Sequence, residues 1–319
     1  MVFIRHPDII IAKKNIALLH LTMADLQNLK DLENLQMKNM KLQAGELQVG
    51  LFTAYQAAQH ILLDGTTLKT LCSTFGLGDS DVSSNEEFMG KVYQVVKRGF
   101  HLYVCDWEDT DICAFHILPH PNNNFDLEGI FLPKREIDLL PKMGNHENWS
   151  SPQKLQIIYI TWYLVHEMSH AIGAILHADG LIKTREAPVT YSAYNLSRYS
   201  RDFIGEDGET YIFGERGFYM ESFLGGILHA VNQLKDEKKI EYLLLEIRGK
   251  HHRVDETQWS EFYQNNIVQT DNPFKPLKAQ PTLEENVPIH RLKGRNNLNT
   301  STRPLRNGIF IRRTHNYSQ

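Results

Sequence analysis

The most apolar stretch of the chain is the segment IIYITWYLV at 157–165, which continues without a turn signal into HEMSHAIGAILHA. Ser151 suits the N-cap of a helix, Pro152 suits its first position, and Asp179-Gly180 suits its end. The pattern predicts one long helix that is apolar on nearly every side and is therefore buried at the centre of the fold. The same segment has strand propensity, so a strand running into a loop is the alternative.

The N-terminal part of the chain has leucines at three-residue steps over 26–35 and looks helical across 15–62. Because this spacing does not hold a strict heptad, it favours an amphipathic helix packed on its own domain over a coiled-coil dimer. A polar, Gly/Ser-rich loop at 73–87 is expected to separate this helical region from the central part of the chain.

Short runs of β-branched and aromatic residues come after the loop. The runs GFHLYVCDW at 99–107 and ICAFHILPH at 112–120 are separated by EDTD and are typical of a hairpin. A third strand is expected in LEGIFLP at 127–133. These runs together predict a small sheet immediately before the long helix.

Three further elements are expected after the long helix. The segment RDFIGEDGETYIFG at 201–214 indicates a hairpin that turns around its Asp-Gly pair. The segments at 215–235 and 237–250 each predict a helix. From 271 onward the chain is rich in Asn, Pro and Arg with little periodicity, so this tail is expected to be largely irregular.

The predicted fold is α+β and mostly helical, with a small mixed sheet beside the long helix. We expect an α-helical N-terminal region at 1–97, a central domain at 98–270 and a basic tail at 271–319. The tail holds nine Lys/Arg and three Asp/Glu, a local charge of +6, whereas the whole chain has a net charge of −4. This mild overall charge gives no indication of a nucleic-acid partner.

Composition narrows the class of protein further. Three cysteines are too few, and odd in number, for a disulfide framework. The N-terminal sequence lacks the features of a secretion signal. The longest apolar run is far shorter than the roughly 20 residues that a membrane span needs. We therefore expect a cytoplasmic protein without a membrane span.

The segment HEMSH places His166 and His170 four residues apart, with Glu167 directly after the first histidine. On a helix, residues i and i+4 lie on one face, so two imidazole nitrogens can bind one metal ion. Glu167, on the flank of that face, can reach an activated water and act as general base. Two nitrogen ligands, a carboxylate base and an open coordination position suit Zn²⁺-dependent hydrolysis.

The third ligand is expected downstream, in ERGFYMESFLGG. On a helix, Gly217, Glu221 and Gly225 would form a stripe in which a carboxylate lies between two residues without side chains. Such a stripe lets another helix approach closely, which would bring Glu221 to the metal. Glu215 is the reserve ligand, or a carboxylate that holds a ligand histidine in place.

A different ligand set must also be considered, because HEMSHAIG extends the motif to H-E-x-x-H-x-x-G with Gly173. The metzincin pattern requires a third histidine three positions later, where this chain has Leu176, and His177 comes one residue too late. The helix would also have to end at the glycine, yet the segment AILHA continues it. The metzincin ligand set is therefore disfavoured.

The pair HEMSH and GFYMESFLGG resembles the gluzincin zinc metallopeptidases, and also a group of uncharacterised fungal proteins with peptidase motifs, over residues 100–235. The resemblance implies a zincin-like central domain, a peptide or protein substrate, and Zn²⁺ bound by His166, His170 and Glu221. It implies that Glu167 is the general base. The chain departs from the common gluzincin pattern in its long gap before Glu221 and in lacking N-E-x-x-S-D there.

Peptide hydrolysis also needs a donor that stabilises the tetrahedral intermediate opposite the base. Candidates are Tyr191, Tyr194 and Tyr199, which lie between the two expected helices, and His229, two turns after Glu221. We assign this role to Tyr194 and His229. The segment GIFLP is expected to be the edge strand that binds an extended peptide.

The residues are compatible with three hypotheses about function. The leading one is a zinc metallopeptidase, a hydrolase with Glu167 as its base. The second is a zincin-fold binding or scaffold protein with structural zinc or none, although a binding module has no need of that base. The third is that HEMSH arose by chance in an all-helical interaction protein, in which case Glu221 lies far from His166 and His170.

Overall fold

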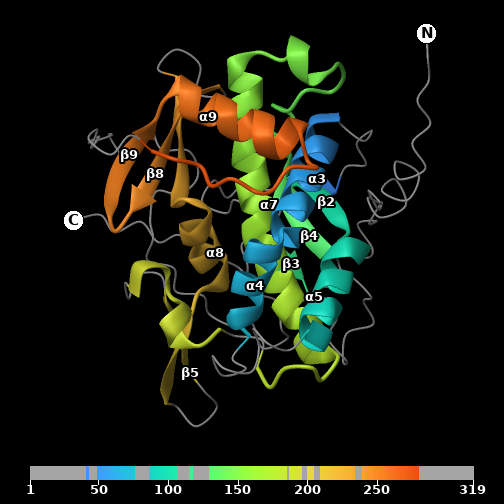
Figure 1. The fold of residues 1–319 in the computed structure, drawn as a ribbon, viewed down its shortest axis with the longest axis vertical. Coiled ribbons are helices and arrows are strands. Elements are labelled where there is room, and N and C mark those ends of the chain that lie inside the picture. The colour runs from blue at the N-terminus through green and yellow to red at the C-terminus, as the bar shows by residue number, and fades with distance from the viewer. Residues whose placement is uncertain are drawn as a thin grey trace.

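The computed structural model of the chain is an α+β fold that is mostly helical, with seven α-helices and three small sheets among the described residues. The residues that the structure describes are 41–42, 49–75, 86–106, 115–117, 129–184, 187–195, 200–204, 209–233 and 239–279. Helix α7 stands at the centre, with α3 to α5 and one sheet on one side and α8 with β8 and β9 on the other (Figure 1).

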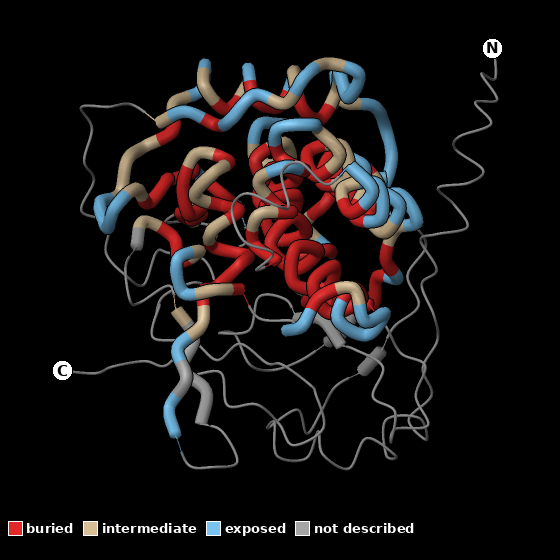
Figure 2. The backbone as a smooth tube through the Cα atoms, turned by 60° about the horizontal axis from the view of Figure 1, so that its bottom comes forward, coloured by how far each residue is buried: buried red, intermediate tan, exposed pale blue. Residues whose placement is uncertain are grey.

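Helix α7, Ser151–Ala178, confirms the predicted long helix. Its N-cap is Ser150, one residue earlier than predicted, and the Ser150 backbone N–H donates to Gln153 Oε1 at 2.9 Å. Its C-cap is Asp179, followed by Gly180 at φ +69°. Every residue from 155 to 176 is buried, so the prediction of a buried central helix is confirmed (Figure 2).

Three helices of the N-terminal half pack together on one side of α7. They are α3 (Val49–Leu63), α4 (Gly65–Ser73) and α5 (Glu86–Arg98). The prediction of a helix holds for 49–62, whereas the leucine steps at 26–35 lie outside the described residues. Buried side chains of all three helices belong to the same hydrophobic cluster as those of α7, so this region shares its core with the central helix.

The first sheet has the strand order β1-β2-β4-β3. Its strands are β1 (Lys41–Leu42), β2 (Leu102–Asp106), β3 (Phe115–Ile117) and β4 (Gly129–Pro133). The three predicted strands are confirmed, but the predicted β2–β3 hairpin is wrong, because β4 lies between them, parallel to β2 and antiparallel to β3. The expectation that GIFLP is an edge strand is wrong for the same reason.

The predicted hairpin at 201–214 is confirmed. Strands β5 (Ser200–Ile204) and β6 (Thr210–Gly214) pair antiparallel, with Ile204 opposite Thr210. The Asp-Gly pair that was expected to form the turn lies outside the described residues. Glu215, the N-cap of α8, follows this hairpin directly.

The helix predicted at 215–235 ends early. Helix α8 is Arg216–Leu224, and the chain then passes through Gly225 and Gly226, at φ +138° and +151°, into strand β7 (Ile227–Asn232). Because L side chains rarely adopt such φ values, the two glycines permit a corner at which a helix becomes a strand. His229 therefore lies on a strand and not on the helix of Glu221.

The helix predicted at 237–250 is also wrong. That segment forms β8 (Ile240–Ile247) and the start of β9 (Lys250–Val254), and both pair antiparallel in the order β7-β8-β9. The turn between them consists of Arg248 and Gly249, both at positive φ, as two-residue hairpin turns require. Burial of YLLLEI between neighbouring strands and the core outweighs its helix propensity.

The remaining described elements complete the shell around α7. They are α6 (Lys134–Ile137), α9 (Glu256–Tyr263), three short 3₁₀ turns (His146–Asn148, Val189–Tyr191, Ala193–Asn195) and a π turn (Gln264–Val268). Helix α9 crosses near one end of α7 (Figure 1). None of the described helices is long and apolar enough to cross a membrane.

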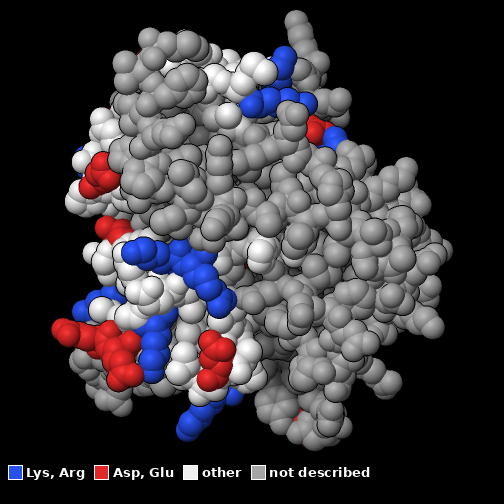
Figure 3. Space-filling view, turned by 90° about the vertical axis from the view of Figure 1, so that its right-hand side faces the viewer, with Lys and Arg blue, Asp and Glu red and all other residues white. Residues whose placement is uncertain are grey.

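Charged side chains do not separate by sign on the described surface that Figure 3 shows. Lysines and arginines lie beside aspartates and glutamates there. Most of the basic tail, from residue 280 onward, lies outside the described residues, so its predicted irregularity stays a prediction there.

Candidate metal centre

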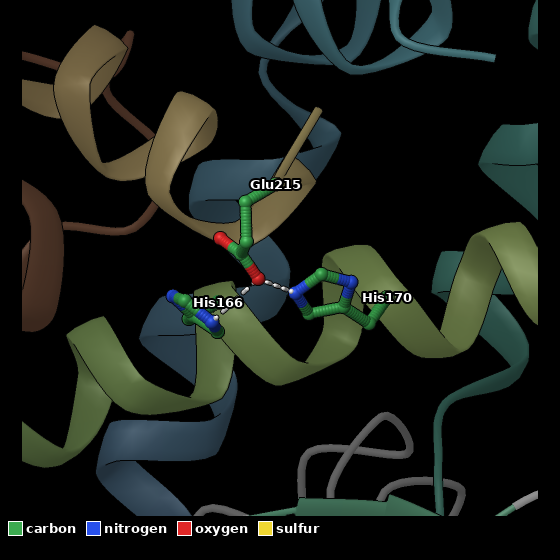
Figure 4. A group of neighbouring side chains, drawn as sticks. All are labelled: His166, His170 and Glu215. Atoms are coloured by element: carbon green, nitrogen blue, oxygen red, sulfur yellow. Dashed lines mark hydrogen bonds and ion pairs between the residues drawn. The ribbon is translucent and has the colours of Figure 1, made fainter. Parts of the chain in front are cut away.

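Helix α7 presents His166 and His170 side by side toward the start of α8 (Figure 4). Both are buried, with 1% and 7% of their surface exposed. The Nε2 atom of His170 lies 2.5 Å from Oε1 of Glu215, and the Nε2 atom of His166 lies 3.5 Å from the same oxygen. We call these three residues the α7 cluster. Their ligand atoms all lie within 4.8 Å of one another.

Glu215 is positioned by its place at a strand-to-helix junction. It follows β6 directly and is the N-cap of α8, where its Oε2 accepts the backbone N–H of Phe218 at 2.6 Å. Its Oε1 is thereby directed to the two histidines. Burial raises the pKa of this carboxyl, but His170 and His166 outweigh that effect and hold the pKa well below its usual value. This direction favours the carboxylate form of Glu215.

Glu221 approaches His166 from the other side of the ring. Its Oε1 lies 2.7 Å from His166 Nδ1, while its Oε2 accepts the backbone N–H of Leu228 at 3.2 Å. The geometry thus differs from the prediction, because Glu215 and not Glu221 joins the two Nε2 atoms. The carboxylate predicted as ligand lies instead against the Nδ1 atom of His166. Its contact with His166 also contradicts the hypothesis of a chance motif, which placed Glu221 far away.

Two glycines allow α8 to lie this close to α7. A Cβ atom at Gly217 would overlap the imidazole ring of His166, so the predicted close approach of a second helix at this glycine is confirmed. A Cβ atom at Gly173 would overlap the guanidinium of Arg216. The same positions cannot take even a methyl group unless α8 or a buried side chain moves.

Arg216 anchors the start of α8 on its other flank. It is 1% exposed, its Nε donates to Thr74 Oγ1 at 2.8 Å, and its guanidinium lies 4.6 Å from the ring centre of Phe75. Gly173 therefore makes room for an arginine and does not end the helix, which runs on to Ala178. The continuing helix removes the geometric basis of the metzincin alternative.

The donor set of the α7 cluster fits a divalent cation. In the absence of a cation, each ring nitrogen of His166 lies next to a carboxylate, Glu215 at Nε2 and Glu221 at Nδ1. Both carboxylates are buried in the same site. A divalent ion at the Nε2 atoms would balance both carboxylates, and a neutral His166 would then donate its Nδ1–H to Glu221. Ligand atoms around tetrahedral Zn²⁺ lie about 3.3–3.6 Å apart. The separation of His166 Nε2 from Glu215 Oε1 is in this range, whereas His170 Nε2 is hydrogen-bonded to that oxygen and would have to move apart from it to bind the same ion.

The remaining predicted catalytic residues lie in different places. Glu167 follows His166 on α7 and is 5% exposed. Tyr194, at φ +55°, donates its hydroxyl hydrogen to the backbone carbonyl of Glu246 at 3.3 Å. His229 Nε2 lies 3.1 Å from Oε2 of the same glutamate. Tyr194 and His229, the two residues predicted to stabilise the tetrahedral intermediate, therefore both contact Glu246, one at its backbone carbonyl and one at its side chain.

Tyr194 lies between carboxylates of two regions. Burial, and then the negative charges of Glu221 and Glu246, raise the pKa of its phenol above the usual value. The phenol therefore keeps its proton at neutral pH and acts as a hydrogen-bond donor. Its ring packs against a small apolar cluster of Ala193, Phe218 and Ile227.

The sequence places Glu215 behind Glu221 as a candidate ligand and gives no role to Glu246, whereas the structure brings these two glutamates, Glu215 and Glu246, into the two His/Glu groups. The sequence signal for Glu215 is its place between the predicted hairpin and the predicted helix, although glutamate is not among the preferred N-cap residues. Glu246 could not be recognised, since its segment was predicted to be helical. A scan against protein-family models and searches of the curated proteins and of the solved structures find no match for this chain.

Proposed function

We propose that the protein is a zinc-dependent hydrolase that cleaves peptide bonds, with His166, His170 and Glu215 as metal ligands. The observation that supports this most is the convergence of both Nε2 atoms on one Glu215 oxygen, next to a glutamate in the H-E-x-x-H arrangement. The peptide as substrate class comes from the resemblance of HEMSH and its downstream glutamate helix to the gluzincins.

Each residue of the candidate site has a distinct role in this proposal. Glu221 holds the Nδ1–H of His166 and so directs the lone pair of Nε2 into the site. Glu215 adds a negative charge while its second oxygen caps α8. Bound Zn²⁺ would supply Lewis acidity and make a water molecule more acidic. Glu167 would accept a proton from that water and would return it to the leaving amine.

The test combines metal content with hydrolysis of a fluorogenic peptide library by the purified full chain. We expect one Zn²⁺ per chain at the α7 cluster. Glu167→Gln should keep this ion and lower kcat/KM by about 10²–10⁴-fold, because proton transfer is lost. Glu261→Gln, at an exposed position on α9, is the matched control and should leave both quantities unchanged.

Three outcomes would count against the proposal. A chain without bound ion at the α7 cluster removes its basis. Unchanged hydrolysis in Glu167→Gln removes the general base. Stoichiometric zinc with no hydrolysis of any library peptide supports the alternative, a zincin-like binding or scaffold protein.

A further inference from the structure

A second group of metal-ligating side chains lies on the sheet β7-β8-β9, outside the centre described above. His229 of β7, Glu246 of β8 and His251 of β9 offer ligand atoms that all lie within 4.8 Å of one another. We call them the sheet cluster. Each of the three strands of this sheet contributes one residue.

Strand register explains why these side chains meet. Glu246 is paired with His251 across the tight Arg248-Gly249 turn, so their side chains leave the same face. His229 is paired with Leu244, two positions before Glu246, and so lies diagonal to the carboxylate on that face. The residues at alternate positions, Leu228, Leu243 and Leu245, belong to the core around α7. The sheet cluster therefore lies on the face opposite to that core.

The ligand atoms of the sheet cluster lie close enough to one another to share an ion. His229 Nε2 lies 3.1 Å from Glu246 Oε2, and His251 Nε2 lies 3.9 Å from the same oxygen. The second separation is too long for a hydrogen bond. The first separation is an ordinary hydrogen-bond length, and the two values bracket the roughly 3.3–3.6 Å expected between ligand atoms of a tetrahedral Zn²⁺ site.

The imidazole of His229 is buried and, among the described residues, satisfied at one nitrogen only, and the unsatisfied Nδ1 is not the nitrogen that contacts Glu246. Only 2% of the His229 side chain is exposed, and its Nδ1 has no hydrogen-bond partner among the described residues. A buried imidazole of purely structural role is usually hydrogen-bonded at both nitrogens, and an unsatisfied one calls for an explanation such as an ion or a water. Glu246 is equally buried, and buried carboxylates need a cation or hydrogen-bond donors.

The exposure of the sheet cluster and the donor atoms of its three side chains indicate which ion would bind. His251 is the rim of the cluster, with 29% of its side chain exposed, so an ion can reach the two buried ligands past it. Two imidazoles and one carboxylate favour borderline transition ions such as Zn²⁺ over Mg²⁺ or Ca²⁺, which prefer oxygen ligands.

We propose that His229, Glu246 and His251 form a second metal site, for a divalent transition ion of the Zn²⁺ class. The ion links all three strands of the sheet that supports α8 through Glu221 and Leu228. It stabilises the folded protein by binding the native arrangement alone. This site does not depend on whether the α7 cluster binds metal or catalyses hydrolysis.

The experiment compares two neighbouring histidines of β9 in the full chain. His251 points to the sheet cluster, whereas His252 is paired with Leu245 and points to the opposite face. Wild type, His251→Ala and His252→Ala are stripped with a chelator and titrated with Zn²⁺ in a calorimeter. Bound metal is also counted by native mass spectrometry with free Zn²⁺ present.

We expect His251→Ala to bind one Zn²⁺ fewer than His252→Ala and wild type. This difference of one equivalent is expected whether the α7 cluster holds an ion or not, so the two proposals fail separately. Zn²⁺ should also raise the Tm of His252→Ala more than that of His251→Ala. Equal stoichiometry in the two variants would overturn the proposal, and so would loss of one equivalent in His252→Ala alone.

Discussion

The α7 cluster and the sheet cluster contain the same kinds of side chain, two histidines and one glutamate, but the molecule supports them differently. In the α7 cluster, Glu221 holds Nδ1 of one histidine and the backbone N–H of Phe218 holds the second oxygen of Glu215. In the sheet cluster, Nδ1 of His229 has no partner among the described residues. His251 is also partly exposed.

This difference between the two clusters indicates that a set of ligand residues does not by itself define a metal centre. Partners of the ligands fix the histidine tautomer and ring orientation, and they commonly change metal affinity by about 10–100-fold. We therefore expect tight binding at the α7 cluster and weaker, exchangeable binding at the sheet cluster. Only the α7 cluster also has a glutamate directly after its first histidine, which is the feature that favours hydrolysis there.

The largest effect is expected from Glu215→Gln. Glutamine can still accept the Phe218 N–H and cap α8, but the anionic ligand is lost. Zn²⁺ affinity at the α7 cluster should fall by more than about 100-fold, which exceeds the usual effect of removing an outer carboxylate. Binding at the sheet cluster should not change. Titration calorimetry measures both, and undiminished tight binding would show that Glu215 is not a ligand.

A smaller effect is expected from Glu221→Gln, which makes the α7 cluster resemble the sheet cluster. A neutral amide holds Nδ1–H less strongly than a carboxylate, so Zn²⁺ affinity should fall by about 10–100-fold, or about 1.4–2.7 kcal/mol. The number of bound ions at saturation should stay the same. A loss of one ion would instead indicate that Glu221 is itself a ligand, as the sequence predicted.

The third effect is on folding stability and not on Zn²⁺ affinity, and it is expected from Gly217→Ala, which presses a methyl group against His166. Overpacking of this kind costs about 1–3 kcal/mol of folding stability, and urea unfolding should report it. Gly90→Ala is the control, because this glycine lies in α5 and a Cβ atom there meets nothing within 4 Å. That control should be neutral or stabilising by up to about 1 kcal/mol. Equal effects would mean that α8 does not need its close approach.

The fold was predictable where local signals and burial agreed. The long helix, its end at Asp179-Gly180 and the β5–β6 hairpin can be derived from caps, turn residues and periodicity. Prediction failed at 215–235 and 237–250, where helix-compatible residues form strands. There, two glycines at positive φ and burial in a sheet decided the conformation. Strand order also escaped prediction, because parallel β2–β4 pairing is a long-range contact.

The sequence by itself determined that His166 and His170 share a helical face, because a spacing of four residues places them one turn apart. It also determined that α8 can approach closely, because Gly217 has no side chain. Only the tertiary structure decided which glutamate faces the two Nε2 atoms. That choice depends on the angle at which α8 meets α7, and the choice of Glu215 over Glu221 is set by packing between residues 45 to 55 positions apart.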